Sequence, residues 1–506
     1  MIRTILTALM VMGAGLVSVF AAEPFNPTPE NSWAFPLDCP DPAAESPIDL
    51  RELNEEEAGA NGWIRLSEDG NGFVRGDGQP IRFWGTHMAN GARYGKKGKP
   101  STDRWSMDDY HRHARWLARL GVNGVRLGNV AIHDPAPDAP PERLDPVMLE
   151  STFRRIAAAK QAGIYCQLSP VWFHGVKDLG AKLDIEGYED GDKALTHLLW
   201  FHPGIQRVYK AWLKELYTTI NPHTGLRIAE DPAVFALELA NEDSMWWFPV
   251  DRIQGEPRRI LQRRFHDWCV ERYGSAGAAL DAWGRRDEED APDEGRLALV
   301  IMWQLTRAGE AIGQIPDARL DDQTAFLIDL QRDFHQQMKT YIRDALGCRQ
   351  VLSSSTFKSV DLVTTEDALR LASQPLDLIC KNHYFGSGGK SDVAGYRLDA
   401  GDVMGLRSAV KHPLELPMRM RPVEGKPFLV TETLWNRMHP YETEGPLVLA
   451  AYEAAMGIDG FFWAGPRDVT WATDPYRRFW KHKGSHPMTV FCNAQPGGMG
   501  MFPAAA

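Results

Sequence analysis

The chain has 506 residues, of which 43% are hydrophobic and 24% are charged, and its formal net charge is −11. This composition is that of a globular protein with an ample core, and it excludes a disordered chain. The negative balance argues against nucleic acid as a partner, because binding a polyanion requires clustered Lys and Arg.

The first 22 residues predict a cleaved signal peptide. Arg3 supplies a positive charge, residues 5–20 form an apolar run, and cleavage is expected after Ala21 or Ala22. The run is too short and too rich in Gly and Ala to predict a membrane span. We therefore expect a secreted protein, periplasmic or extracellular, with no membrane attachment after cleavage and no obligate protein partner.

The six cysteines are scattered and form no C-x-x-C pair, so the spacing typical of zinc ligands is absent. Export permits disulfides, whose pairing the sequence leaves open. Cys166 and Cys380 lie inside apolar strand-like runs, and we expect both to be buried free thiols. Cys39, Cys269, Cys348 and Cys492 are the other four.

Residues 23–80 predict an N-terminal arm followed by a β-hairpin layer. Short apolar runs at residues 63–66, 73–75 and 81–83 are separated by Asp-Gly-Asn-Gly and Asp-Gly sequences. Both sequences are strong signals for tight turns between antiparallel strands.

From residue 81 onward, strand-like runs alternate with helix-like runs. Buried strands are predicted at residues 81–85, 124–127, 164–168, 234–239, 351–352, 376–380, 427–430 and 460–462. Alternation of strand and helix eight times predicts a (β/α)₈ TIM barrel, an α/β fold, over residues 81–485.

Two helices of the barrel carry clear signals. Ser106 and Asp109 form a capping-box start, and Gly121 is expected to end the helix that follows. An apolar stripe from Phe326 to Ile342 predicts a long helix.

Two segments depart from the alternation. Residues 243–325 form a large insertion after the fourth strand, with a helical stretch at 259–273 and an acidic run at 287–290. That run is expected to be a solvated surface, with calcium binding as the minor alternative. A short helix is expected at 476–483. The tail, residues 486–506, leaves open whether the chain is a fragment lacking C-terminal modules or a bare barrel domain.

Functional groups of a (β/α)₈ barrel lie at the carboxyl ends of its strands. Glu242 and Glu432 follow the fourth and seventh strands, with polar or aromatic side chains at the other strand ends. Hydrolysis of a glycosidic bond requires two carboxyl groups on opposite sides of the anomeric carbon, one protonated and one ionised. The two glutamates are therefore the candidate catalytic pair.

Three further strand-end residues suit the same chemistry. Arg126 can hold a carboxylate in its ionised form. Asn241 can donate a hydrogen bond to a sugar 2-hydroxyl. Trp463 can provide a platform under the sugar that lies next to the scissile bond.

Four more residues are candidates for substrate binding. Trp246 and Trp247 begin a loop on the catalytic face, where they can stack on sugars or form the core of the insertion. His87 and His383 are candidates to contact the substrate, or to be satisfied histidines behind it.

Three motifs carry a resemblance to a known family. The segments Leu-Gly-Val-Asn-Gly-Val-Arg-Leu at 120–127, Leu-Ala-Asn-Glu at 239–242 and Phe-Leu-Val-Thr-Glu at 428–432 resemble strand signatures of glycoside hydrolase clan A. They look closest to family 5-like cellulases and mannanases. The segment 265–284 is similar to an insertion in clan A galactosidases. The resemblance implies a retaining mechanism, with Glu242 as acid/base and Glu432 as nucleophile.

The sequence also departs from the family 5 pattern. The family usually carries a His after strand three, whereas residues 169–174 read Ser-Pro-Val-Trp-Phe-His, so this role is vacant or filled by His133 or His174. His383 and Tyr384 are adjacent, where the family spaces them by one residue. Tyr384 is the candidate to hydrogen-bond the nucleophile.

The leading hypothesis is a retaining O-glycosyl hydrolase that cleaves β-linked bonds in a polysaccharide or oligosaccharide. One alternative is a catalytically silent carbohydrate-binding barrel, against which the two glutamates argue. Another is an exo-acting enzyme similar to β-galactosidases or agarases. A metal-dependent hydrolase would need converging ligands that the strand ends lack. No cofactor motif occurs, since G-x-G-x-x-G and G-x-x-x-x-G-K-[ST] are both absent.

Overall fold

The computed structural model describes residues 48–506 except 96–98, 192, 308–311, 358, 387–396, 399–406, 417–419, 421, 436–438, 465–487 and 490–496, and also residues 28, 30 and 31. The chain divides into two units, residues 1–37 and residues 38–506. In the first, the Thr28 N–H donates to Asn31 Oδ1 at 2.6 Å. The predicted signal peptide, Cys39, Cys492 and the helix expected at 476–483 lie outside the described residues.

Eight parallel strands form the central sheet of the second unit. They are β4 (Phe83–His87), β7 (Gly124–Gly128), β8 (Tyr165–Ser169), β9 (Val234–Glu238), β10 (Val351–Ser353), β11 (Ile379–Asn382), β13 (Phe428–Thr433) and β14 (Gly460–Trp463). Their order in the sheet is β10-β9-β8-β7-β4-β14-β13-β11. All eight predicted strands are confirmed.

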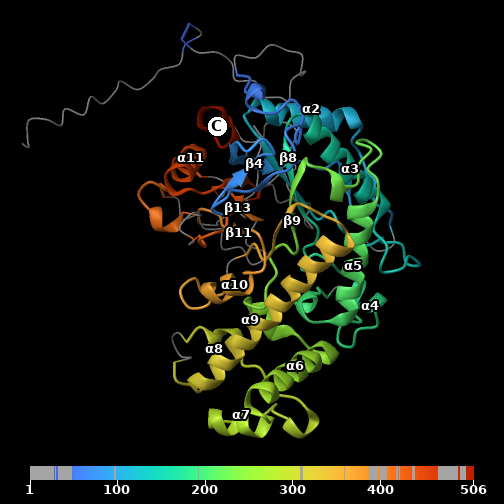
Figure 1. Cartoon of the computed structure of the whole chain (residues 1–506), viewed down its shortest axis with the longest axis vertical. Coiled ribbons are helices and arrows are strands. Elements are labelled where there is room, and N and C mark those ends of the chain that lie inside the picture. The colour runs from blue at the N-terminus through green and yellow to red at the C-terminus, as the bar shows by residue number, and fades with distance from the viewer. Residues whose placement is uncertain are drawn as a thin grey trace, which may run out of the picture. The chain divides into compact units, whose positions relative to one another are not determined.

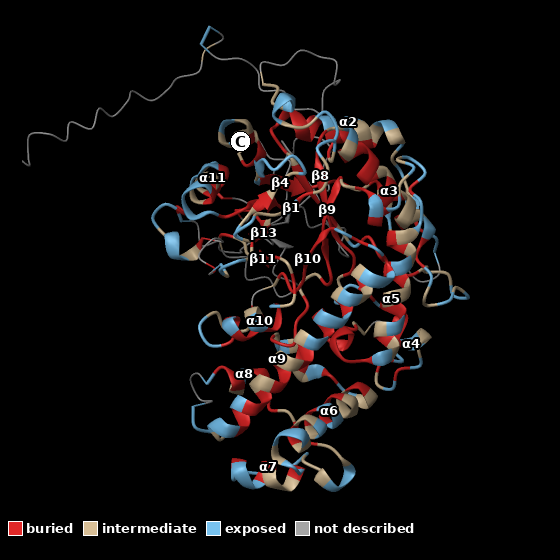
Figure 2. Ribbon diagram, in the orientation of Figure 1, coloured by how far each residue is buried: buried red, intermediate tan, exposed pale blue. Residues whose placement is uncertain are grey.

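The sheet nearly closes on itself between β10 and β11. The N–H groups of Asp377 and Leu378, just before β11, donate to the Leu352 carbonyl in β10 at 2.9 and 3.3 Å. The buried strands lie inside a ring of helices whose outer faces are exposed (Figures 1 and 2). This arrangement is the predicted (β/α)₈ barrel.

Within the described residues, six of the longer helices connect or flank the strands. They are α2 (Met107–Arg119), α3 (Pro146–Gln161), α5 (Pro203–Thr218), α9 (Asp317–Thr340), α10 (Glu366–Ala372) and α11 (Glu444–Met456). The predicted capping box starts α2: Ser106 Oγ accepts from the Asp109 N–H at 3.2 Å, and Asp109 Oδ2 accepts from the Ser106 N–H at 2.8 Å. Buried Phe326, Leu330 and Phe334 form the predicted stripe of α9.

A small antiparallel sheet of β1 (Arg65–Leu66), β2 (Phe73–Val74) and β3 (Pro80–Ile81) is the predicted hairpin layer. Phe73 packs edge-on against Phe83 and Phe235, with ring centroids 5.6 and 6.1 Å apart, so the layer covers the amino ends of β4 and β9. The expected start of the first barrel strand at residue 81 is wrong by two residues. Ile81 pairs with Phe73 in the layer, and the barrel strand begins at Phe83.

The remaining elements are short. They are η1 (Arg51–Leu53), β5 (Ala92–Arg93), β6 (Thr102–Asp103), α4 (Leu179–Lys182), η2 (Leu198–Trp200), η3 (Ile228–Glu230), the π-helix η7 (Tyr341–Ala345), β12 (Arg397–Leu398), η8 (Pro413–Glu415), β15 (Met488–Thr489), η10 (Met499–Met501) and α12 (Phe502–Ala505). The tail is therefore structured in part: β15 pairs with β12, and Phe502 is fully buried.

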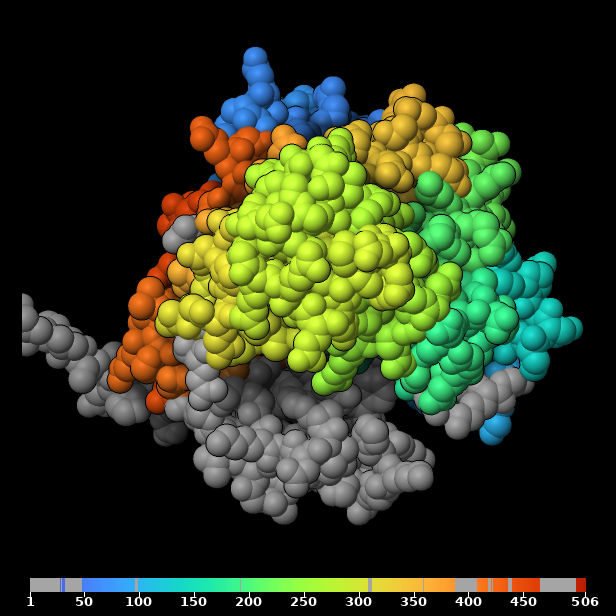
Figure 3. Space-filling view, turned by 90° about the horizontal axis from the view of Figure 1, so that it is seen from below, coloured from blue at the N-terminus to red at the C-terminus, as the bar shows by residue number. Residues whose placement is uncertain are grey.

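The insertion contains η4 (Phe248–Arg252), α6 (Gly255–Tyr273), α7 (Ala276–Trp283), η5 (Pro292–Glu294) and α8 (Met302–Leu305). Its yellow-green atoms occupy the centre of the face shown in Figure 3. The expectation of a solvated acidic run is wrong for Asp290. Both of its carboxylate oxygens accept from Arg319 at 2.8 Å, and each side chain is 1% exposed.

Three further expectations bear on the chemistry of the molecule. Cys166 and Cys380 are buried free thiols, as are Cys269 and Cys348. None of the helices in the described part of the chain is long and apolar enough to cross a membrane. Within the same residues, no group of three or more His, Cys, Asp or Glu side chains is arranged to hold a metal ion.

The buried Asp290–Arg319 pair should stabilise the insertion. Asp290→Ala leaves the guanidinium buried without its partner, which costs about 3–5 kcal/mol when one member of a buried pair is removed. Urea unfolding of the variant measures this loss. Glu186→Ala is the matched control, because it removes a more exposed pair with Arg259 and should hardly change the free energy of unfolding. Equal effects of the two variants would contradict the structural role of Asp290.

Candidate active site

Arg126 on β7 lies at the centre of the strand ends. Its side chain is 2% exposed. Nε and Nη2 donate to the two oxygens of Glu238 at 2.8 to 3.1 Å, and Nη1 donates to Glu432 Oε1 at 2.6 Å. One guanidinium thus holds carboxylates from β9 and β13, and a bidentate charge-assisted contact of this kind fixes orientation as well as charge.

Glu238 is the residue of this network that the sequence reasoning missed. It is fully buried, and Ser169 Oγ on β8 donates to its Oε1 at 3.1 Å. Burial raises the pKa of Glu238, while the charge of Arg126 opposes that rise. A signal was present, because a Glu inside the apolar run 234–240 has to be paired when the strand is buried.

Glu432 on β13 is held as an anion. Its Oε1 accepts from Arg126, and its Oε2 accepts from the Tyr384 hydroxyl. Burial alone would raise the pKa of Glu432, but the charge of Arg126 and these hydrogen bonds outweigh burial, and the pKa is lowered. The hydrogen bond expected of Tyr384 is present.

The strand pairing is irregular on both sides of Glu432. The register of β13 against β14 shifts between Val430 and Thr433, and that of β11 against β13 shifts between Lys381 and Asn382. Such irregularities bend a strand and redirect the side chains beside them.

Glu242 follows β9, and its pKa is shifted in the opposite direction from that of Glu432. Burial and then the negative charge of Glu432 raise its pKa to about 8. Its Oε1 accepts a hydrogen bond from Asn382 Nδ2 at 3.1 Å. One carboxyl group is thus protonated and the other ionised near neutral pH, which is the division that acid catalysis beside a nucleophile requires.

The backbone at Glu242 is unusual. Its φ is +44°, a left-handed conformation that a residue with a side chain adopts only when its surroundings impose it. The Glu242 N–H donates to Thr356 Oγ1 at 3.1 Å. Buried Asp243 accepts from the His197 N–H through both carboxylate oxygens, at 3.0 and 3.1 Å. These contacts fasten the loop on either side of the glutamate.

Asn241 is brought into the same network. Its Oδ1 accepts from Arg126 Nη2 at 2.8 Å and from Thr356 Oγ1 at 3.0 Å. The carbonyl oxygen is therefore used within the protein. Donation to a sugar would come from Nδ2, which has no acceptor among the described residues.

The four histidines considered above lie in different settings. His87 is buried beside Thr431, with Nε2 3.1 Å from its carbonyl oxygen, and burial lowers the pKa of His87 to about 4. The half-buried His383 donates its backbone N–H to the Glu432 carbonyl at 2.9 Å. His133 is buried and stacks on Trp212. His174 is exposed.

The structure does not support a platform role for Trp463. The side chain is 0% exposed. It stacks on Trp435, with ring centroids 5.9 Å apart, and Phe502 packs edge-on at 6.1 Å. Both neighbours come from distant parts of the chain and leave neither face of the indole open to a sugar.

Trp246 and Trp247 differ although they are adjacent. Trp246 is 0% exposed, so it belongs to the core beneath the loop, the alternative named above. Trp247 is half-buried and lies over Phe357, with ring centroids 5.3 Å apart. Of the two, only Trp247 presents a surface that a substrate could reach.

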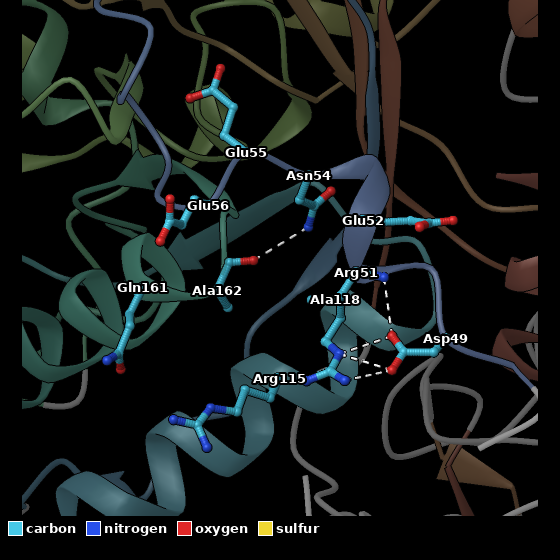
Figure 4. Close-up of a pocket in the computed structure, with 10 residues that line it drawn as sticks. All are labelled: Asp49, Arg51, Glu52, Asn54, Glu55, Glu56, Arg115, Ala118, Gln161 and Ala162. Carbon is cyan, nitrogen blue, oxygen red and sulfur yellow. Dashed lines mark hydrogen bonds and ion pairs between the residues drawn. The ribbon is translucent and has the colours of Figure 1, made fainter. Parts of the chain in front are cut away.

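A hollow of about 690 Å³ lies away from these residues (Figure 4). It is lined by Asp49, Asn54, Arg115 and Gln161 among others. Asn54 Nδ2 donates to the Val122 carbonyl at 2.9 Å, just before β7. The hollow is therefore at the amino ends of the strands, the end of a barrel that supports stability rather than chemistry.

Comparison with known proteins shows similarity at the level of fold. No family model matches the sequence, and no curated protein sequence matches it. The glycoside hydrolase family 5 mannosidase from Rhizomucor miehei has a similar structure, with a TM-score of 0.50 and 12% identity over 88% of this chain and 96% of that chain. A single-site mutant of that enzyme gives a TM-score of 0.51 and 11% identity over the same shares. At this identity, the comparison shows a shared barrel architecture.

The coupling between the two glutamates can be measured. Glu432→Gln removes the charge that helps to raise the pKa of Glu242, so this pKa should fall from about 8 while burial keeps it above its ordinary value of 4.5. Carbon-detected NMR titration of labelled Glu residues measures the shift. Glu453, whose pKa burial also raises to about 8, provides the control. Glu453→Gln should delete one high titration and leave that of Glu242 unchanged. An unshifted Glu242 in Glu432→Gln would show that the two carboxyl groups do not interact.

The packing of Trp463 predicts a loss of stability on truncation. Trp463→Ala should lower the free energy of unfolding by about 3–5 kcal/mol, as removal of a buried aromatic side chain does. Trp247→Ala, which truncates a half-buried indole, should lower it by much less. Urea unfolding of both variants decides the point. Full stability of Trp463→Ala with loss of sugar binding would restore the platform role.

Proposed function

We propose that the protein is a retaining glycoside hydrolase of clan A that cleaves β-linked bonds in a polysaccharide or oligosaccharide. The observation that carries the proposal is that the pKa values of the two carboxyl groups are shifted in opposite directions. Glu432 is held ionised by Arg126 and Tyr384, while burial and the nearby anion keep Glu242 protonated.

The first step uses each group in its resting state. The Glu432 carboxylate attacks the anomeric carbon, the glycosidic C–O bond breaks, and Glu242 gives its proton to the departing oxygen. The sugar is then joined to Glu432 as an ester. Arg126 and Tyr384 aim the attacking carboxylate, because each binds one of its two oxygens.

The second step follows from the same electrostatics. Once Glu432 is esterified, its negative charge is gone and the pKa of Glu242 falls. The Glu242 carboxylate then takes a proton from a water molecule that attacks the anomeric carbon. The ester bond breaks, Glu432 leaves as a carboxylate, and two inversions give a product of retained configuration.

Substrate binding is assigned around this pair. Asn241 Nδ2 is proposed to bind the 2-hydroxyl, and His87, His383 and Tyr384 to line the sugar next to the scissile bond. Trp247 is proposed to stack on a further sugar. A silent binding barrel is the second candidate, but a neutral sugar gives it no use for a protonated Glu beside an ionised one. Secretion after removal of residues 1–22 is part of the proposal.

Stereochemistry and chemical rescue test the assignment. Proton NMR of the first product should show retained configuration, after a screen on mannan, cellulose, xylan, agarose and galactan finds the polymer that is cleaved. Glu432→Ala should lose activity on every substrate, and added azide should give an inverted glycosyl azide. Glu242→Ala should still react with an aryl glycoside that needs no acid, and azide should give a retained product.

Two results would contradict the proposal. Inversion by the wild-type enzyme would rule out Glu432 as nucleophile. Full activity of both variants would rule out the catalytic pair altogether. Glu453→Gln serves as the control, because it removes a buried carboxyl group of similarly raised pKa that the proposal leaves outside the active site.

A further inference from the structure

Four aromatic side chains form a continuous row at the carboxyl ends of three neighbouring strands. Trp172 and His174 follow β8, Trp247 follows β9, and Phe357 follows β10. Successive ring centroids are 5.0 Å apart for Trp172 and His174, 5.8 Å for His174 and Trp247, and 5.3 Å for Trp247 and Phe357. We call these four residues the aromatic row.

The aromatic row lies at the surface and packs on a buried side chain. His174 is exposed, and the other three side chains are half-buried. Behind Trp247 lies His197, fully buried, with ring centroids 6.0 Å apart. The His197 N–H is bound by Asp243, next to Glu242. The row is therefore held in place by the same contacts that hold the loop of the acid/base.

The row lies on loops that adjoin Glu242. Phe357 is adjacent in sequence to Thr356, whose Oγ1 accepts the Glu242 N–H at 3.1 Å. Trp247 lies on the loop that Glu242 begins. The strands β8, β9 and β10 are consecutive in the sheet, and Glu242 follows the middle one, β9. Glu432 is on β13, and β11 separates β13 from β10 where the sheet nearly closes. The row thus extends from the side of the site that carries Glu242.

This position assigns the row to one part of the substrate. In the proposed reaction, Glu242 delivers its proton to the oxygen of the leaving group, while Glu432 bonds to the other sugar. Sugars that extend from the leaving oxygen start at Glu242, and the surface that continues from Glu242 is the aromatic row. The flat C–H faces of β-linked sugars match uncharged rings, and truncating such aromatic anchors commonly weakens binding strongly.

We propose that Trp172, His174, Trp247 and Phe357 bind the leaving-group side of a β-linked oligosaccharide, so that the enzyme prefers bonds with several sugars beyond the cleaved one. The inference rests on the proposed glycosidase function. It adds that Trp247 is a specificity-determining residue that acts through binding rather than through the chemistry at the anomeric carbon.

Two classes of substrate separate binding from chemistry. An aryl glycoside of one sugar has a phenol as leaving group and cannot reach along the row. Manno-, cello-, xylo-, agaro- and galacto-oligosaccharides of increasing length place added sugars on it. For the series that is cleaved, wild-type kcat/KM should rise with length, and reducing-end labelling should show several sugars on the leaving side.

The variants then give opposite results on the two classes. Trp247→Ala should lower kcat/KM on the longer oligosaccharides by roughly tenfold or more, the scale of losing an aromatic anchor, and leave kcat/KM on the aryl glycoside near the wild-type value. Trp247→Phe, which keeps a ring, should recover most of the loss. Phe357→Ala should behave like Trp247→Ala. Trp303→Ala on α8, an aromatic residue that is 45% exposed and outside the row, is the matched control and should change neither class.

The failure of the inference differs from failure of the proposed function. A parallel loss on aryl glycoside and oligosaccharides in Trp247→Ala would show a structural role and overturn the assignment of the row. Unchanged length dependence in that variant would also overturn it. If the wild-type protein cleaves neither class, the proposed function is wrong, and the inference is rejected with it.

Discussion

The buried guanidinium of Arg126 is the interaction on which the rest of the site depends. It binds Glu238 with two nitrogens and Glu432 with the third, and it also donates to Asn241 and Ser169. A charge this deep is costly unless it is fully paired. Four neighbours, on or just after β8, β9 and β13, accept hydrogen bonds from the guanidinium. Arg126 therefore joins these strands, keeps Glu432 ionised and fixes the position of Asn241.

The pKa of Glu242 is raised, whereas that of Glu432 is lowered, because Glu242 lies near this network but forms no ion pair with it. It receives one hydrogen bond from an amide, that of Asn382, and no cation contacts it among the described residues. Burial and the charge of Glu432 then dominate its pKa. The left-handed backbone at Glu242 is the conformational cost of placing its carboxyl group there, and the buried contacts of Asp243 and Thr356 offset it.

Different loops at the strand ends carry different parts of the proposed site. Those after β8, β9 and β10 carry the aromatic row, while Tyr384 follows β11 and Glu432 lies on β13. The insertion after β9 has its own core, in which Arg319 pairs with Asp290 and lies 4.7 Å from the ring centroid of Trp283. Trp247, at the start of the insertion, packs instead on His197 and Phe357, which belong to other loops of the barrel.

The sequence by itself determined the barrel and the catalytic candidates. Apolar runs mark all eight strands, and the carboxyl ends of parallel strands meet at one edge of a barrel, so Arg126, Glu432 and Tyr384 could be placed together in advance. Only the tertiary structure decided which of the flagged aromatic residues is accessible, how Glu238 is paired, and that Asp290 is buried. These outcomes depend on neighbours far apart in the chain, such as residues 435 and 502 around Trp463. A local pattern records the type of a side chain and the face of the strand or helix on which it lies, but burial is set by what the fold packs on top of it.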